Sequence, residues 1–419
     1  MNNLQKLLAV ITIAFVSIQP VLAQQTERVP ALREKVYSQL ARAQAVAEEQ
    51  NNEAGIKVLE SVADRASSMN SYERAMLWNF FGFMYYEQGD TAQAIDYFAR
   101  VVNEQPIPAS LEKSTLFSLA QLTLSEGQLD AAVNYVEQWQ QQASADELPK
   151  AWVLKAQALY QQGDYQKALQ PIAKAIAAKE QEGEVAKENW LILARAIHYE
   201  LQQTREVANQ LEQLVIHYSK PEYWLQLAGV YGQLEQNKKQ LAVLEAAYQQ
   251  GFIEKPSELR NLAQVYYLNE LPFKAAELMK KGLEQGKLQS NLSNLKFLAQ
   301  SLAQAKEYDA AIVAYRRAAE QGDTGELLAQ AAQLALNLDE NQQAISLANE
   351  ALSAGALKNA GNMHLVKGMA FVNQQQYSQA LEAFNRAMEF DAVAAAAGQW
   401  AEYAESQKKY QQQLARQGS

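Results

Sequence analysis

The chain has 419 residues, of which 48% are hydrophobic and 20% are charged, with a formal net charge of −10 and no cysteine. This composition is typical of a foldable soluble protein, and the acidic balance argues against binding to nucleic acid or to a bare anionic membrane surface. The lack of cysteine excludes disulfides, thiol catalysis and a lipid-modified cysteine.

The first 23 residues differ from the rest of the chain. Lys6 is the only charged residue before Glu27, residues 7–18 form an apolar run, and residues 21–23 are small or medium-sized. This pattern predicts a secretory signal peptide that is cleaved after Ala23. An uncleaved membrane anchor is the less favoured alternative, because about a dozen apolar residues fall short of the ~20 that span a bilayer.

No segment after the signal peptide approaches a membrane-spanning helix, and Ala, Leu, Gln and Glu, which favour helix, are abundant. A short export signal on a helical protein without disulfides suits the periplasm of a Gram-negative bacterium better than a eukaryotic secretory pathway. We therefore expect a periplasmic protein.

Helical repeats are expected from residue 36 onward, after a lead-in segment over residues 24–35. Residues 36–69 form a degenerate first repeat, in which Ala43 and Gly55 are the small contact residues. It lacks the large aromatic residues of the next repeat, as expected of a repeat at the end of an array.

Residues 75–108 carry the most regular pattern in the chain. Large and small residues stand at repeat positions 4, 8, 11, 20, 24 and 32, namely Trp78, Gly82, Tyr85, Ala94, Phe98 and Pro106. This spacing predicts two antiparallel helices that approach closely at the small residues, with the aromatic rings filling the space beside them. The pattern resembles that of the tetratricopeptide repeat family.

A single pair of helices cannot bury its own apolar faces, so further repeats are expected. Eight more copies of the pattern follow in the sequence. They cover residues 113–146, 149–182, 187–220, 221–254, 256–289, 292–325, 325–358 and 361–394. Pro149, Pro221 and Pro256 stand at the first position of their repeats, where proline is favoured in a helix. Residues 395–419 are expected to form a capping helix and tail.

The resemblance implies an all-α, right-handed superhelix of about ten helix-turn-helix repeats over residues 36–394. In this family the concave groove, lined by the first helices, binds a protein or peptide. The family's groove positions correspond here to Phe83, Tyr86, Phe117, Gln121, Tyr160, Arg195, His198, Tyr199, Arg260, Gln264, Tyr267, Lys296 and Gln300. The alternative for each aromatic residue is burial against the next repeat. Lys296 and Gln300 match only half of the family's carboxylate clamp, so a chaperone's C-terminal tail is not the expected ligand.

The overall organisation also resembles that of periplasmic tetratricopeptide repeat proteins that accompany TonB, ExbB and ExbD energy transduction in gammaproteobacteria. That resemblance implies a scaffold for envelope proteins. The alternatives are an adaptor in outer-membrane, polysaccharide or division machinery, and an accessory domain of a hydrolase or transferase.

Catalytic, metal and cofactor sites are not expected from the sequence. His198, His217 and His364 are too scattered to provide a pair of metal ligands on one helical turn. Residues 282–287 resemble a phosphate-binding loop only superficially, because three residues rather than four separate the glycines and Leu288 replaces the Ser or Thr that would hold magnesium. We expect a helix end with turn glycines there.

Overall fold

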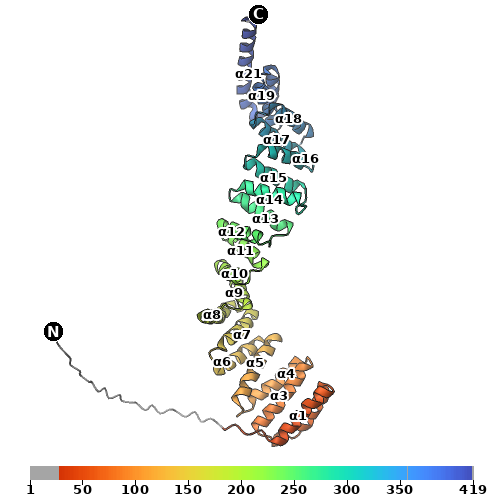
Figure 1. Cartoon of the computed structure of the whole chain (residues 1–419), viewed down its shortest axis with the longest axis vertical. Coiled ribbons are helices and arrows are strands. Elements are labelled where there is room, and N and C mark those ends of the chain that lie inside the picture. Colours follow the sequence, from red (N-terminus) through yellow and green to blue (C-terminus); the bar gives the residue numbers. More distant parts are fainter. Residues whose placement is uncertain (1–27, 356, 418–419) are drawn as a thin grey trace, which may run out of the picture. The chain divides into compact units, whose positions relative to one another are not determined.

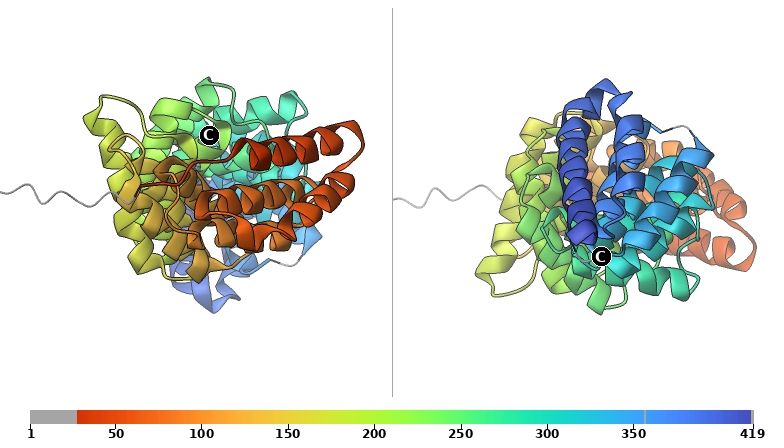
Figure 2. Two further views of the ribbon diagram at one scale, coloured as in Figure 1. Left: turned by 90° about the horizontal axis from the view of Figure 1, so that it is seen from below. Right: turned by 90° about the horizontal axis from the view of Figure 1, so that it is seen from above.

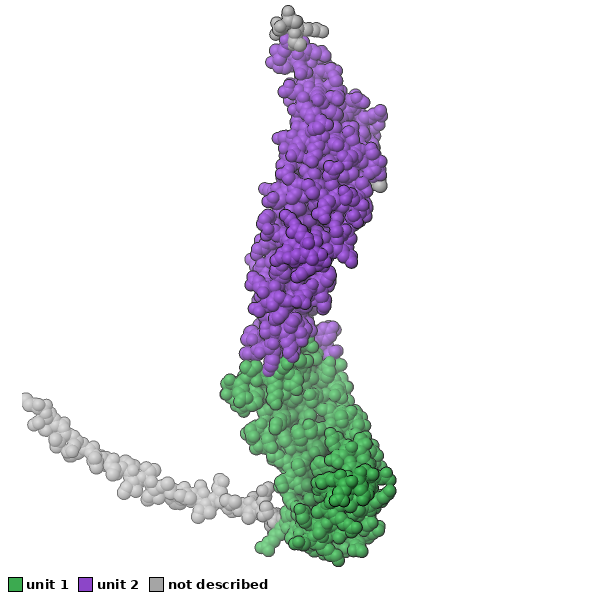
Figure 3. Space-filling model, turned by 45° about the vertical axis from the view of Figure 1, so that its right-hand side comes forward, with its two compact units in different colours: residues 1–197 green, residues 198–419 purple. Residues whose placement is uncertain are grey.

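The computed structural model describes residues 28–355 and 357–417. The expected signal peptide therefore lies outside the described residues, as do residues 24–27 of the lead-in. The described residues form 21 α-helices and one short 3-10 helix, with no strand among them. The chain divides into two compact units, Met1–Ile197 and His198–Ser419, which Figure 3 colours separately.

The first unit is a series of antiparallel helix pairs, which the left view of Figure 2 shows from below. Its helices are α1 (Glu34–Glu49), α2 (Asn52–Ala63), η1 (Ala66–Ser68), α3 (Ser71–Glu87), α4 (Thr91–Asn103), α5 (Ala109–Ser125), α6 (Leu129–Gln142), α7 (Leu148–Gln161) and α8 (Tyr165–Gln181). Helix α9 (Glu188–Glu200) runs across the division between the units.

The second unit also consists of helix pairs, whose helices have 12 to 15 residues, and of a longer terminal helix of 27 residues (Figure 1). They are α10 (Thr204–Tyr218), α11 (Pro221–Gln233), α12 (Asn237–Gln249), α13 (Pro256–Leu268), α14 (Pro272–Glu284), α15 (Leu292–Gln304), α16 (Tyr308–Ala319), α17 (Thr324–Asn337), α18 (Asn341–Ala354), α19 (Ala360–Asn373), α20 (Tyr377–Met388) and α21 (Asp391–Gln417). The prediction of an all-α solenoid of about ten helix pairs is confirmed. The terminal helix begins at Asp391, four residues before the expected boundary at 395.

In two pairs a glycine on the first helix receives an aromatic ring from the second helix. A Cβ placed on Gly82 of α3 would lie 2.6 Å from the Phe98 ring of α4, and one on Gly368 of α19 would lie 2.3 Å from the Phe384 ring of α20. Both contacts join positions 8 and 24 of their repeats. In the first pair, a Cβ on Gly55 would lie 2.7 Å from Ala47 and 2.9 Å from the Ala43 carbonyl, so the small contacts expected there are present.

Trp78 and Trp152 lie less deep than the consensus pattern suggests, whereas Trp190, at the same repeat position, is buried. Ala94 and Phe98 are buried, but Trp78 and Trp152 are only partly buried. The Trp78 ring lies 6.0 Å from Tyr97, and its indole Nε1 donates a hydrogen bond of 3.2 Å to Glu104. The polar edge of this ring needs a partner, which keeps it at the margin of the core rather than at its centre.

In nine of the ten pairs, from α3–α4 to α19–α20, the turn contains one residue with a positive φ angle, whereas the α1–α2 turn contains none. In α3–α4, α5–α6 and α7–α8 this residue is glycine, as Gly89 with φ 82° shows. In the later pairs the same turn position carries a side chain, namely Gln202, Glu235, Glu270, Lys306, Asp339 and Gln375. A left-handed conformation costs roughly 1–2 kcal/mol for a residue with a Cβ, so packing of the helices must enforce these six turns.

Neighbouring pairs in the second unit are joined by tyrosine–glutamate hydrogen bonds. The Tyr266 hydroxyl of α13 donates to Glu245 of α12 at 2.8 Å, and the Tyr231 hydroxyl of α11 donates to Glu212 of α10. Burial, followed by the adjacent carboxylate, raises the pKa of both phenols. Both tyrosines therefore stay protonated and act as donors to the preceding repeat.

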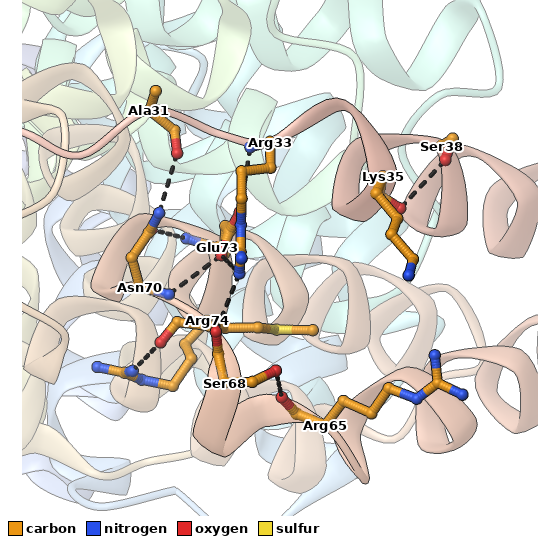
Figure 4. Close-up of polar contacts among 10 residues, drawn as sticks. Ala31, Arg33, Lys35, Ser38, Arg65, Ser68, Asn70, Glu73 and Arg74 are labelled. Carbon is orange, nitrogen blue, oxygen red and sulfur yellow. Dashed lines mark hydrogen bonds and ion pairs between the residues drawn. The ribbon is translucent and has the colours of Figure 1, made fainter.

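An ion pair between Arg33 and Glu73 ties the lead-in to the second repeat (Figure 4). The buried Glu73 carboxylate accepts hydrogen bonds of 2.6 Å from both Nε and Nη2 of Arg33 and one of 3.1 Å from the Asn70 amide, within the capping box of α3. The Asn70 side chain in turn donates to the Ala31 carbonyl at 2.9 Å. The hydrogen bonds from Arg33 are the largest cause that lowers the pKa of Glu73 to about 2.

We expect Gly368→Ala to destabilise the second unit by about 1–3 kcal/mol, because the new methyl group would overlap the Phe384 ring. Gly229→Ala is the matched control. Nothing lies within 4 Å of a Cβ at Gly229 in α11, so the same change should stabilise by about 0.5–1 kcal/mol through helix propensity. Urea unfolding of both variants measures the difference, and equal effects would contradict the assigned contact.

Glu73→Gln should weaken the attachment of α1 in a pH-dependent manner. Because the folded pKa of Glu73 lies below its ordinary value of 4.5, the ionised carboxylate stabilises the fold above about pH 4.5, and this contribution is lost as the pH falls toward 2. Arg33 is 58% exposed, so solvent reduces the effect to about 1–2 kcal/mol.

Hydrogen exchange of the α1 amides measures this local stability, since a long repeat array need not unfold as one unit. The free energy of local opening of α1 should differ between the wild-type chain and Glu73→Gln by a constant amount from pH 7 to 5. This difference should shrink below pH 5. A difference independent of pH would mean that the ion pair does not provide the stability.

Candidate functional site

The residues expected to line a groove lie on the first helices of their pairs, namely α3, α5, α7, α9, α13 and α15. Two of those in the first unit are well exposed, with Phe83 at 51% and Tyr86 at 53%. Both lie on α3, three residues apart, and therefore share one side of this helix. Gln121, at the position in α5 that corresponds to Phe83, is also exposed.

Three of the expected groove aromatics contact an aromatic ring on the second helix of their own pair. Phe83 lies edge-on to Phe98 with ring centroids 5.3 Å apart. Phe117 and Tyr160 are partly buried. The ring centroids of Phe117 and Trp139 are 4.9 Å apart, and those of Tyr160 and Tyr165 are 5.4 Å apart. These aromatic rings are therefore held in place by local packing before any partner binds.

The three expected residues on α9 differ in their surroundings. Arg195 is partly buried and Tyr199 is 68% exposed. The Nδ1 atom of His198 lies 2.7 Å from the Gln203 side-chain oxygen, which holds this imidazole against the turn before α10.

Helices α13 and α15 bring together a cation, two aromatic rings and an amide. The Arg260 guanidinium donates a hydrogen bond to the Asn294 side-chain oxygen and lies 6.0 Å from the centre of the Phe297 ring. Tyr267 meets Phe297 edge-on at 5.7 Å. We call Arg260, Tyr267, Asn294 and Phe297 the α13–α15 cluster.

Hydrogen bonds from α15 and the preceding turn hold the α13–α15 cluster in position. Asn294 is 7% exposed, and its amide nitrogen donates to the Gln289 carbonyl at 2.9 Å. The Asn294 backbone amide donates to the Asn291 side chain, which caps α15. A guanidinium fixed by a buried amide beside two partly exposed rings can bind a carboxylate and an apolar side chain together.

The remaining expected residues lie on the same two helices. Gln264 is exposed and Gln300 is partly buried. Lys296 forms an ion pair of 3.1 Å with Asp323, the residue before α17. The lysine charge is therefore already paired within the chain, which weakens the partial likeness to a carboxylate clamp.

The sequence analysis did not identify Asn294, Phe297 or Asp323 as part of this surface. Arg260 and Asn294 are 34 residues apart, as are Lys113 and Glu147, which form another ion pair between repeats. A search for polar partners separated by one repeat length could have found both pairs.

The part of the chain that the structure describes has neither a metal-binding cluster nor a phosphate-binding loop at residues 282–287. No group of three His, Asp or Glu side chains there could hold a metal ion. His364 of α19 has its pKa lowered first by burial and then by Lys367 and Arg386. The resemblance to a phosphate loop is explained by a helix end, because α14 ends at Glu284 and Gly286 has φ 68°. The predicted turn is therefore confirmed.

The family comparison agrees with this architecture. A sequence model of the tetratricopeptide repeat family matches residues 40–110 and 117–182. These two segments are similar to tetratricopeptide repeats. They span the α3–α4 and α7–α8 pairs and most of the α1–α2 and α5–α6 pairs, and the remaining described pairs have the same all-α architecture. No curated protein matches the chain.

Several solved tetratricopeptide repeat structures are similar over parts of the chain. YrrB, described as having an unusual peptide-binding site, is 15% identical, with 46% of this chain and 96% of YrrB covered and a TM-score of 0.36. MamA from Desulfovibrio magneticus RS-1 is 14% identical, with 42% and 94% covered and a TM-score of 0.34. The P58(IPK) repeat domain is 14% identical, with 90% and 99% covered and a TM-score of 0.26. Scores this low add nothing to the argument from the helix pairs.

Proposed function

We propose that this chain is a non-catalytic scaffold that binds a protein or peptide on the surface of its first helices. The observation that carries the proposal is the α13–α15 cluster, in which Arg260 is oriented by Asn294 beside the rings of Phe297 and Tyr267. Pre-oriented aromatic and arginine side chains are the groups that most often dominate the binding energy of protein interfaces. The fold supports the same class of function.

The finer proposal is that the scaffold works in the periplasm and serves TonB-type energy transduction. It is supported by the export signal in the sequence, by the absence of cysteine and by the acidic charge. No helix among the described residues is long and apolar enough to cross a membrane. The second candidate is an adaptor in cell-envelope assembly, and the identity of the captured partners separates the two.

Partner capture tests the proposed binding surface. We expect Arg260→Ser with Tyr267→Ala to weaken binding of partners recovered by crosslinking in a Gram-negative envelope by about tenfold or more, since this change removes the cation and one ring. Phe273→Ala with Lys280→Ser on α14 is the control, because it removes an aromatic ring and a cation from the exposed surface of a second helix. Partners that the cluster variant retains and the control loses would contradict the assignment.

The mass of the exported chain tests the predicted localisation. When the full gene is expressed in a Gram-negative host, we expect the periplasmic fraction to contain a chain that begins at Gln24, because cleavage is predicted after Ala23. Intact mass spectrometry measures the start directly. A chain that retains residues 1–23 and sediments with membranes would instead indicate the anchored form.

A further inference from the structure

A cleft of about 640 Å³ lies between α1 and α2 and reaches η1. Its apolar surface includes Val36, Val62 and Met69, each less than a tenth exposed. Five cationic side chains line it, and no aspartate or glutamate does. They are Arg33, Lys35, Arg42, Lys57 and Arg65. We call this site the basic cleft.

The charge of the basic cleft is unusual for this chain, whose formal net charge is −10. Three other clefts of comparable size carry both signs of charge. Glu277 and Glu284 accompany the lysines near α14, and Glu307 and Arg317 both line the cleft near α16. Asp130, Glu137 and Asp164 accompany the lysines near α8. A solvated helix surface of this protein therefore normally mixes acids with bases, and the basic cleft does not.

Two of the five cations are neutralised by acids outside the lining of the cleft. Arg33 pairs with the buried Glu73, and Lys57 pairs with Glu53 at 2.8 Å. Lys35, Arg42 and Arg65 form no ion pair with another described residue. Figure 4 shows the charged ends of Lys35 and Arg65 on the same side of the Glu73 network, without a polar contact to the residues drawn.

The Arg33–Glu73 pair also gives the basic cleft a fixed wall. Arg33 is held by Glu73 and donates a further hydrogen bond of 2.9 Å to the Ser68 carbonyl in η1. The start of α1 is thereby fixed relative to η1 and to the start of α3. Lys35 and Arg42 lie on α1 and Arg65 lies directly before η1, so the positive site is present before any ligand binds.

We propose that the basic cleft binds an acidic peptide segment of a partner protein that also carries apolar side chains. The unpaired cations would receive the carboxylates, and the valine and methionine surface between them would receive the apolar groups. The volume is in the range of about 300–1,000 Å³ of ligand pockets. A long nucleic acid is disfavoured, because the acidic remainder of the chain would repel it.

The basic cleft is a different site from the α13–α15 cluster, because it belongs to the first helix pair and contains none of the cluster's residues. A scaffold with both sites would bind two segments of one partner or two partners at once. Each site can therefore fail in a test without the other.

Fluorescence anisotropy with a labelled twelve-residue peptide of alternating glutamate and valine tests the proposal on the full chain. We expect saturable binding that weakens steeply with salt, and a loss of about tenfold or more in affinity for Arg42→Glu with Arg65→Glu. Both side chains are exposed and unpaired among the described residues, so the fold should survive, which circular dichroism verifies.

Lys167→Glu with Lys174→Glu in the cleft near α8 is the matched control, since it makes the same change in net charge at another cleft. The affinity of this control for the peptide should stay within about twofold of the wild-type value. The same is expected of Arg260→Ser with Tyr267→Ala. An equal loss in the lysine control would overturn the proposal in favour of long-range charge alone.

Two further outcomes would also overturn the proposal. Equal binding of a peptide with glutamine in place of glutamate would show that charge does not select the ligand. Sedimentation that shows self-association of the wild-type chain, abolished by Arg42→Glu with Arg65→Glu, would identify a second copy of the chain as the occupant.

Discussion

The close approach of the two helices within each pair is the contact on which this structure depends. Gly82 and Gly368 have no Cβ because the rings of Phe98 and Phe384 occupy that space. A pair closed in this way still has an apolar side that it cannot bury alone. The next pair covers that side, so one local contact, repeated along the chain, generates each unit.

Because every pair touches mainly its neighbours, the polar contacts also extend over about one repeat. Arg260 reaches Asn294 at a separation of 34 residues, and Arg33 reaches Glu73 at a separation of 40. Both candidate binding sites are therefore built by adjacent helices inside one unit. The basic cleft belongs to the first pair, and the α13–α15 cluster belongs to two consecutive repeats of the second unit.

The turns show how strongly the packing of the pairs governs the backbone. Glycine fills the left-handed position in three turns of the first unit, whereas residues such as Lys306 and Gln375 adopt φ angles of 63° and 60° in the second. These side chains carry an intrinsic cost in that conformation. Packing of the surrounding helices must therefore offset the cost of the left-handed conformation. Glycine is then not required at this turn position, and the repeat pattern of the sequence is weaker there.

The sequence by itself determined the helix pairs, because the spacing of Gly82, Phe98 and their equivalents specifies two helices that approach each other closely at the small residues. It also indicated which helices carry the exposed Phe83 and Tyr86. Only the tertiary structure decided how deep each ring lies, as Trp78 and Phe117 show, since burial depends on residues from the facing helix. The same holds for the binding sites. Asn294 orients Arg260, and no acidic residue lines the basic cleft. Both features depend on which side chains the packing of different helices brings together.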